Sequence, residues 1–409
     1  MTSAETSAAR RVVPGMGWPG LPAREDSAPV GWAGTHDCRA TPDTGAPDAD
    51  DGGDGAATIA ESDDEDAADA ATDEVDESAH GEPPDPTPRT PTTGESVIDS
   101  VAGEALADSP VLQAVTEDAR KRARLASAGF PRPEHTRVLT VSNQKGGVGK
   151  TTTAVNIAAA LASRGLNVLV VDTDPQGNAS TALSIDHHAD IPSIYDVLVD
   201  GVAMSEVVQP CPDVENLWCV PATIDLAGAE IELVSLVARE SRMNKALTTL
   251  ASDREAAGQE RLDYVIIDCP PSLGLLTVNA FVAATEVLIP IQCEYYALEG
   301  LSQLLKNIEL IKTHLNPALH VSTILLTMYD GRTNLSQQVA QEVRTHFPDQ
   351  VLDAVVPRSV RISEAPSHGQ TVITYDPAST GALSYLEAAA QIADRGVAHP
   401  LDPQAKDPA

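Results

Sequence analysis

A glycine-rich stretch at residues 144–153, QKGGVGKTTT, constrains the fold of this 409-residue chain more than any other feature. An apolar run at 138–142 precedes it and predicts a buried strand, and an alanine-rich run at 153–162 follows it and predicts a helix. Glycines let consecutive backbone N–H groups point at one anion, and a helix N-terminus adds partial positive charge. Strand, glycine loop and helix in this order predict a phosphate-binding loop.

Within such a loop, Lys150 is expected to reach the β- and γ-phosphates of a nucleotide, and the Thr151 hydroxyl to ligate Mg²⁺. The usual pattern has a glycine five residues before this lysine, but here that position holds Lys145, so the loop carries two lysines. A simple glycine turn before a core helix is the alternative, and the two threonines after Lys150 argue against it. The predicted nucleotide-binding residues of the loop are Lys145, Gly146, Gly147, Val148, Gly149, Lys150, Thr151 and Thr152.

Strands alternate with helices along the rest of the chain. Strands are predicted at 137–143, 167–172, 263–268, 286–290, 321–327 and 352–356, and helices at 151–164, 226–251, 275–284, 298–314, 334–346 and 379–394. Continuous apolar strands, as at 168–171, are typical of a parallel sheet covered on both faces. We therefore expect an α/β fold with a doubly wound, mostly parallel sheet, in which ligands bind beyond the carboxyl ends of the strands.

Two stretches are less regular. Residues 194–198 suggest one or two helical turns and 217–220 an additional strand, within a segment at 180–224 that is otherwise unclear. A charged loop is expected at 253–261, and nothing in its sequence assigns it a function.

Composition divides the chain. Between residues 41 and 100 there are 19 acidic residues against the single base Arg89, and no Phe, Tyr or Trp. Such a segment cannot bury enough apolar surface to offset its ordering entropy. We expect a disordered acidic extension at 1–108, a short helical linker at 109–130, a P-loop α/β domain at 131–396 and a disordered tail at 397–409.

Charge and cysteine content narrow the function. The net charge is −33, and residues 131–409 contribute −15 of it, which argues against broad, charge-driven binding to nucleic acid. Any DNA contact would have to come from a local basic patch. The five cysteines lack Cys-x-x-Cys spacing, and no signal peptide or membrane-length apolar run is present, so a cytoplasmic protein with reduced thiols is expected.

Three acidic residues stand at the ends of predicted strands. Asp172 and Asp174 end one apolar strand, and Asp268 ends another, in the position of a Walker B carboxylate. A buried strand does not hold a bare carboxylate without cost, which suggests a cation or a polarised water nearby. The alternatives are a turn at Asp174-Pro175 and a structural cap at Asp268.

The two-lysine loop and four further motifs resemble the ParA/MinD family of deviant Walker A ATPases, and the chromosomal ParA (Soj) branch within it. The motifs are KGGVGKTT at 145–152, VDTDPQGNA at 171–179, IIDCPPSLG at 266–274, QCEYYALEG at 292–300 and PRSVRISEAPSHG at 357–369. This resemblance covers residues 137–393. It implies a P-loop NTPase fold that binds ATP and Mg²⁺ and hydrolyses ATP.

The resemblance also implies roles for single residues. Lys145 would cross a dimer interface to the partner's nucleotide, Asp174 would position the attacking water, and Asp172 and Asp268 would support Mg²⁺ together with Thr151. Met328, Pro357 and Ser359 would flank the nucleoside, and Arg332, Arg358 and Arg361 would form a DNA-binding surface. The implied partners are a second copy of the chain, non-specific double-stranded DNA of the nucleoid, and a ParB-type centromere-binding protein.

Three alternative functions remain at this point. A division-site regulator like MinD would need a basic amphipathic C-terminal helix for the membrane, whereas residues 383–395 carry one base and suit docking on the core. A DNA-binding regulator would need a helix-turn-helix domain, and the acidic extension shows no such pattern. A redox iron–sulfur protein of the nitrogenase-reductase type would need a different cysteine pattern.

Overall fold

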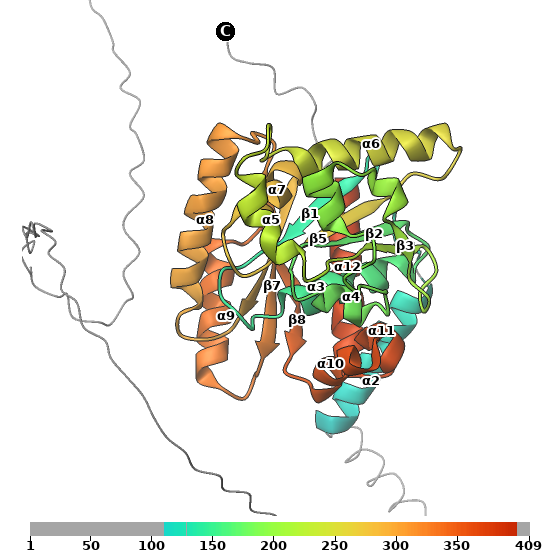
Figure 1. Ribbon diagram of the computed structural model, residues 1–409. Helices are drawn as coiled ribbons and strands as arrows, with labels where there is room; N and C mark the ends of the chain where they lie inside the picture. The colour runs from blue at the N-terminus through green and yellow to red at the C-terminus, as the bar shows by residue number, and fades with distance from the viewer. Residues whose placement is uncertain (1–109, 128, 399–409) are drawn as a thin grey trace, which may run out of the picture. The chain divides into compact units, whose positions relative to one another are not determined.

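The computed structural model describes residues 110–127 and 129–398 (Figure 1). The predicted acidic extension at 1–108 lies outside the described residues, and so do residues 399–409 of the predicted tail. Residues 397 and 398, expected in that tail, instead end the last helix. In this helix, Leu383, Tyr385 and Ile392 are buried, so packing against the core stabilises the helix.

Eight strands form one sheet in the order β3-β4-β2-β5-β1-β6-β7-β8. Every strand pair is parallel except β3–β4. This arrangement confirms the predicted doubly wound, mostly parallel sheet. The strands are β1 (Arg137–Val141), β2 (Val168–Asp172), β3 (Gln209–Pro210), β4 (Leu217–Val220), β5 (Tyr264–Asp268), β6 (Glu286–Gln292), β7 (His320–Tyr329) and β8 (Val351–Pro357).

Helices cover both faces of the sheet (Figure 1). On one face are α2 (Pro110–Ser127), α3 (Lys150–Ala162), α4 (Asn178–Ala182), α10 (Val360–Glu364), η3 (Ala365–His368), α11 (Val372–Tyr375) and α12 (Thr380–Ala398). On the other are η1 (Asp196–Asp200), η2 (Met204–Glu206), α5 (Leu226–Leu233), α6 (Arg242–Ala256), α7 (Leu275–Ala283), α8 (Ala297–His314) and α9 (Asn334–His346). Both faces of the sheet are therefore covered, which explains why the central strands are mostly apolar.

Strand register brings the functional loops together. Asp268 at the end of β5 lies level with Val141 of β1 and with Asp172 of β2. The central strands therefore all end on the same side of the sheet, at their carboxyl ends, and the loop after β1 begins there.

One predicted helix, at 226–251, is wrong, because the structure has two helices there. Helix α5 ends at Leu233 and α6 begins at Arg242, and between them Ala238 adopts a left-handed φ of 55°. The Asn279 side chain of α7 fixes the break by donating to the Arg239 carbonyl (2.7 Å) and accepting from the Met243 N–H (3.2 Å). Helix α6 also runs to Ala256, so the expected loop at 253–261 starts later than predicted.

Helix α2, at the predicted linker, packs against α12. The Arg122 guanidinium donates to the carbonyls of Pro377 (2.9 Å) and Ser379 (3.0 Å), and Leu125 is buried. Lys121 lies 3.5 Å from Glu387 of α12. The linker helix is thereby joined to the core.

Both edges of the sheet are protected from further strand pairing. The edge strand β3 has only two residues, one of them Pro210, which has no N–H to donate. At the opposite edge, the Gln391 side-chain oxygen accepts from the backbone N–H groups of Asp353 (2.9 Å) and Ala354 (3.4 Å) in β8. Short length, proline and occupied N–H groups are all features that limit edge-to-edge association.

Candidate functional site

The glycine loop joins β1 to α3 at the carboxyl edge of the sheet. Gly147 and Gly149 adopt φ values of 72° and 88°, and Gly149 is the N-cap of α3. No atom lies within 4 Å of a Cβ added at either position, so the backbone angle, and not space, requires glycine. The loop is held from two neighbouring strands: Thr327 of β7 donates to the Val148 carbonyl (2.8 Å), and Asn143 donates to the Pro290 carbonyl of β6 (2.9 Å).

Lys150 begins α3 and is buried. Burial lowers the pKa of Lys150, and the nearby carboxylates of Asp268 and Asp174 oppose this shift. Its ammonium donates one hydrogen bond, to the Lys145 carbonyl (3.3 Å). The residue predicted to bind phosphate therefore places a cation inside the loop, among acidic groups that would otherwise repel an anion.

Lys145, the additional lysine, points to a different partner. Its ammonium lies 2.6 Å from a carboxylate oxygen of Glu294, in the loop between β6 and α8. Both side chains are partly exposed, at 37% and 45%. The sequence did not predict this contact, although Glu294 lies inside one of the motifs that resemble the family.

The two carboxylates at the strand tips are fully buried, but their surroundings differ. Asp172 accepts from the Asp174 N–H (3.2 Å), the Ser180 N–H (2.9 Å) and the Ser180 hydroxyl (2.8 Å). Burial raises the pKa of Asp172 to about 6 in spite of these bonds. Its oxygens are thus occupied in shaping the loop that follows β2.

Asp268 has no such support. Both of its oxygens are buried without a hydrogen-bond partner among the described residues, although the Thr151 hydroxyl is close enough to act against the rise in its pKa. Burial, followed by the neighbouring Asp172, raises the pKa of Asp268 well above its usual value. An orphaned buried carboxylate beside a threonine hydroxyl is the hard-oxygen environment that suits Mg²⁺. The residues present therefore fit the metal.

Asp174 lies just beyond β2 in a tight turn. One of its carboxylate oxygens accepts from the Gln176 N–H (3.0 Å), and its carbonyl accepts from the Gly177 N–H (2.9 Å). The turn and the catalytic interpretations of this residue are compatible, because no described residue donates to the second oxygen. The Thr152 side chain, in the first turn of α3, is half-buried.

The predicted nucleoside residues lie two and three strands from β1. Tyr329, which follows Met328, pairs in register with Pro357 of β8, and Ser359 is the N-cap of α10. Met328 has a left-handed φ of 49°, unusual for a residue other than glycine. The structure brings these three residues to the same edge of the sheet as the glycine loop.

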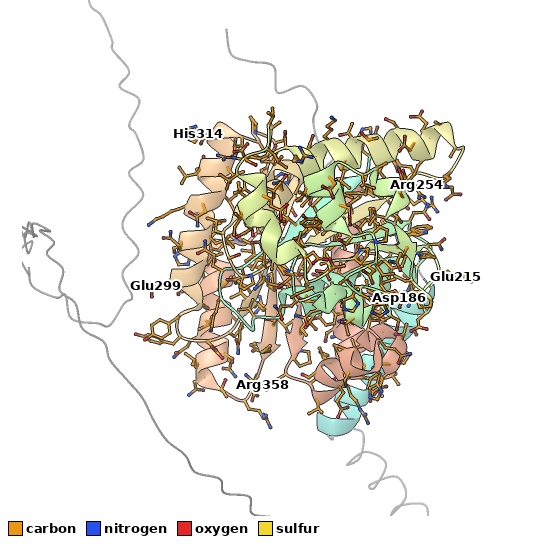
Figure 2. All side chains as sticks on the ribbon, viewed as in Figure 1. Asp186, Glu215, Arg254, Glu299, His314 and Arg358 are labelled. Atoms are coloured by element: carbon orange, nitrogen blue, oxygen red, sulfur yellow. The ribbon has the colours of Figure 1, made fainter. Side chains whose placement is uncertain are left out.

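The predicted DNA-binding arginines occupy the loops after β7 and β8. Arg332 is 91% exposed and pairs with Asp330 at 2.9 Å, an interaction that lowers the Asp330 pKa to about 2. Arg361 pairs with Glu364 (3.3 Å) and Asp376 (3.5 Å). Arg358 projects from the end of β8 and has no ion pair with a described residue (Figure 2). Of the three, only Arg358 is an unneutralised cation.

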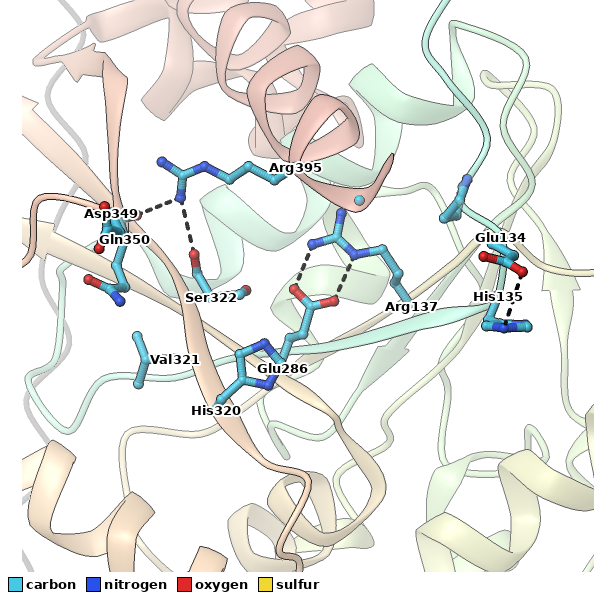
Figure 3. A pocket seen from close by; sticks show the side chains of 12 residues that line it. Glu134, His135, Arg137, Glu286, His320, Val321, Ser322, Asp349, Gln350 and Arg395 are labelled. Carbon is cyan, nitrogen blue, oxygen red and sulfur yellow. Dashed lines mark hydrogen bonds and ion pairs between the residues drawn. The ribbon is translucent and has the colours of Figure 1, made fainter. Parts of the chain in front are cut away.

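The opposite end of the strands holds a cavity of about 510 Å³ (Figure 3). On its wall, Arg137 forms two hydrogen bonds with Glu286, of 2.7 and 2.6 Å, and donates to the Ile392 carbonyl of α12 (2.6 Å). Arg395 of α12 donates to the carbonyls of Ser322, Gln350 and Val351. Because these contacts join β1 to β6 and hold α12 against the strands, the cluster is structural.

Two observations bear on membrane binding. In α12, the buried apolar side chains, among them Leu383, Tyr385 and Ile392, pack in the core against α3 and β8 and are unavailable to a lipid surface. Among residues 110–127 and 129–398, no helix combines the length and apolar character needed to cross a bilayer.

Fold and loop together define a doubly wound P-loop nucleotide-binding protein whose loop carries two lysines. A family profile described as an AAA domain matches residues 136–321. The chain is 52% identical over 261 residues to the sporulation initiation inhibitor protein Soj of Bacillus subtilis, covering 64% of this chain and 99% of Soj. It is 51% identical over 259 residues to the chromosome partitioning protein ParA of Myxococcus xanthus, covering 63% of this chain and 88% of that protein.

Among solved structures, a cobyrinic acid a,c-diamide synthase of Mycobacterium smegmatis with bound ADP and magnesium is similar. It is 39% identical, covers 62% of this chain and 92% of its own, and superimposes with a TM-score of 0.52. The near-complete coverage of Soj at 52% identity decides the assignment: this chain belongs to the ParA/Soj family of chromosome-partitioning ATPases.

Proposed function

We propose that this chain is an ATP-driven switch for DNA segregation. ATP and Mg²⁺ bind at the glycine loop, two ATP-bound subunits form a sandwich dimer, and the dimer binds double-stranded DNA without sequence preference. Hydrolysis to ADP and phosphate, stimulated by a ParB-type centromere-binding protein, releases the DNA and moves a chromosome or plasmid over the nucleoid. The observation that carries this proposal is the pair of loop lysines, one buried toward its own site and one on the surface.

The chain's own residues provide the parts that phosphoryl transfer requires. The backbone of residues 146–149 and the Lys150 ammonium hold the β- and γ-phosphates, and Asp174 orients the attacking water with its second carboxylate oxygen. Thr151 and Asp268 would hold Mg²⁺, with Asp172 maintaining the loop around them. When bound, the metal neutralises charge on the phosphates. The related M. smegmatis structure with ADP and magnesium supports this choice of ligands.

An exposed apolar surface beside the site supports the dimer. Ile231 in α5 is 79% exposed and Val237 is 88% exposed. Ile224 and Val234, which flank α5, are also exposed, and so is Leu273 in the loop that follows Asp268. A Cβ added to Gly274 would lie 1.7 Å from the Glu230 carboxylate, so α5 contacts the loop that follows Asp268. Exposed apolar groups of this kind favour a protein partner, and their contact with the metal-side loop supports a partner that depends on the nucleotide.

A DNA-binding comparison in three nucleotide states tests the proposal. Wild-type protein should bind unrelated duplexes with ATP and Mg²⁺ and release them with ADP or without nucleotide. Lys150→Ala should lose nucleotide binding, because the phosphates lose their cation. Asp174→Ala should bind ATP and DNA but turn over poorly.

The same comparison on residues 110–409 examines the acidic extension, whose removal should leave a folded ATPase. DNA affinity that is independent of nucleotide in both proteins would contradict the switch. Normal ATP hydrolysis by Asp174→Ala would contradict the water-positioning role.

A further inference from the structure

One contact in the site is not explained by nucleotide binding. The proposed function needs Lys145 in the partner subunit's site, yet in the single chain its ammonium lies 2.6 Å from Glu294. We propose that Glu294 is a positioning residue that holds Lys145 on its own subunit and competes with the partner's nucleotide for it. This inference rests on the proposed function, because it concerns the lysine that would act across the dimer.

Sheet order creates the contact. Strands β1 and β6 are parallel neighbours, with Val141 level with Leu288, so the loops that follow them leave the sheet side by side. Lys145 stands in the loop after β1 and Glu294 in the loop after β6. An intramolecular carboxylate is therefore placed next to this lysine before any partner arrives.

The Lys145 backbone is fixed, which leaves its side chain as the part that can move. The Lys145 N–H donates to the Asn143 side chain (3.0 Å), and its carbonyl accepts from Lys150 (3.3 Å). Asn143 is itself bonded to the Pro290 carbonyl. The ammonium can exchange partners by side-chain rotation alone, without rearranging the phosphate loop.

Glu294 is held in place from its other side. One carboxylate oxygen accepts a short hydrogen bond from the Gln292 side chain, while the other meets Lys145. The Glu294 N–H donates to the Gln292 carbonyl (2.8 Å), and the Glu294 carbonyl accepts from the Ala297 N–H at the start of α8 (3.0 Å). A carboxylate oriented by its own loop is a defined acceptor and not a side chain sampling the surface.

The strength of the ion pair suits a reversible restraint. A partly exposed pair changes an equilibrium by about 1.4- to 5-fold. A symmetric dimer breaks two of them, so dimerisation is weakened by about 2- to 30-fold in their presence. Such a penalty raises the threshold for the dimer without preventing it. Salt should reduce the penalty, because both side chains are accessible to solvent.

The test uses Glu294→Gln, which keeps the shape of the side chain and removes its charge. Glu299→Gln is the matched control, because Glu299 lies nearby in the first turn of α8, is exposed and has no ion pair with a described residue (Figure 2). The monomer–dimer dissociation constant is measured by analytical ultracentrifugation of the full chain with a non-hydrolysable ATP analogue and Mg²⁺. Analogue affinity is measured at concentrations where the chain is monomeric.

We expect Glu294→Gln to lower the dimer dissociation constant by about 2- to 30-fold, without changing analogue affinity, and Glu299→Gln to leave it unchanged. The decisive arm is Lys145→Ala combined with Glu294→Gln, which should equal Lys145→Ala alone, because Glu294 acts only through the lysine. A purely structural role would give the same change in both backgrounds. Glu294→Asp, which keeps the charge, should retain part of the restraint.

The outcomes separate the two proposals. A dimer that is unchanged or weakened in Glu294→Gln, or an effect that persists without Lys145, overturns the restraint and leaves the ATP-dependent dimer intact. A Lys145→Ala protein that dimerises as well as wild type overturns the action of the lysine across the dimer, and the restraint with it.

Discussion

Two acidic residues at the ends of adjacent strands lower the stability of the nucleotide-free protein. Asp172 and Asp268 are level in the sheet and both are fully buried; burial raises the pKa of each, and Asp172 raises the pKa of Asp268 further. Ser180 and the Asp174 N–H support Asp172, but nothing comparable supports Asp268. A buried charge without a partner destabilises the nucleotide-free protein, and a bound cation would relieve this cost.

Replacing Asp268 by Asn should therefore stabilise the nucleotide-free protein. Removing the unpaired charge is expected to contribute about 1–2 kcal/mol, a rise in Tm of about 2–8 °C for a domain of this size. The same variant should lose the additional stabilisation that Mg²⁺ gives in the presence of ATP. Thermal melts with and without the ligands measure both effects, and a lower Tm in the nucleotide-free variant would contradict the role of Asp268.

At the other end of the strands, Arg137 and Glu286 show the opposite arrangement, in which a buried pair is fully bonded. Burial alone would raise the Glu286 pKa and lower that of Arg137, but their mutual hydrogen bonds outweigh it, so Glu286 is lowered and Arg137 raised. Glu286→Gln leaves a buried guanidinium uncompensated, which should cost about 3–5 kcal/mol of unfolding free energy.

This cost should depend on pH. A carboxyl group with a lowered folded pKa contributes stability that is present above its unfolded pKa and lost as pH falls through the folded value. The difference between wild type and Glu286→Gln should therefore be largest near neutral pH and shrink below the ordinary glutamate pKa of 4.5. Urea unfolding at several pH values measures it, and a constant difference would show that packing, not charge, is responsible.

At the scale of elements, helix α2 depends on a few polar contacts. The Arg122 guanidinium donates hydrogen bonds to two carbonyls just before α12. Charge-assisted hydrogen bonds of this kind contribute about 1.5–3 kcal/mol to stability when well formed. Arg122→Ala should accelerate amide hydrogen exchange across α2 while leaving ATP hydrolysis unchanged. Arg120→Ala is the matched control, because Arg120 is exposed and has no ion pair with a described residue. Equal exchange in the two variants would mean that the Arg122 hydrogen bonds do not hold α2 in place.

Some strands and site residues could be predicted from the sequence, whereas other features could not. Apolar runs indicated the strands at 168–172 and 264–268 and the parallel sheet, because burial on both faces leaves a simple pattern. The break between α5 and α6 has no glycine or proline to mark it, and it depends on Asn279, some forty residues away. Likewise, motif positions indicated Lys150 and Asp268, but the Lys145–Glu294 contact arises from strand order, which no local pattern encodes.

At the scale of the whole molecule, charge limits how DNA can be bound. The chain carries a net charge of −33, and of the proposed DNA residues Arg332 and Arg361 are paired with carboxylates. Glutamate substitution at Arg332 or Arg361 should weaken DNA binding similarly on unrelated duplexes, because phosphate contacts carry no sequence information. Arg358→Glu should cost most, because its charge is not already neutralised.

The salt dependence of DNA affinity makes the effect of these arginine substitutions quantitative. A symmetric dimer that loses one phosphate contact per subunit should lose about two units of slope in log affinity against log salt. Nucleotide affinity is measured on the same variants, because Arg358 and Arg361 lie near Ser359, and a loss of ATP binding would explain a loss of DNA binding indirectly. Arg39→Glu, in the extension, is the control; unchanged DNA binding in all three arginine variants would exclude this surface.

The blunted edges of the sheet have a consequence for assembly. Under the proposed function, copies of this chain pair when ATP binds and are concentrated on DNA, so the chain has to avoid pairing with those copies in any other orientation. A sheet with an open border would polymerise strand to strand whether or not a nucleotide was present. Pro210 at one edge and Gln391 at the other limit that route, which leaves the proposed ATP-dependent association to other surfaces. Gln391→Ala would be expected to leave the single chain folded and to make its aggregation less dependent on ATP.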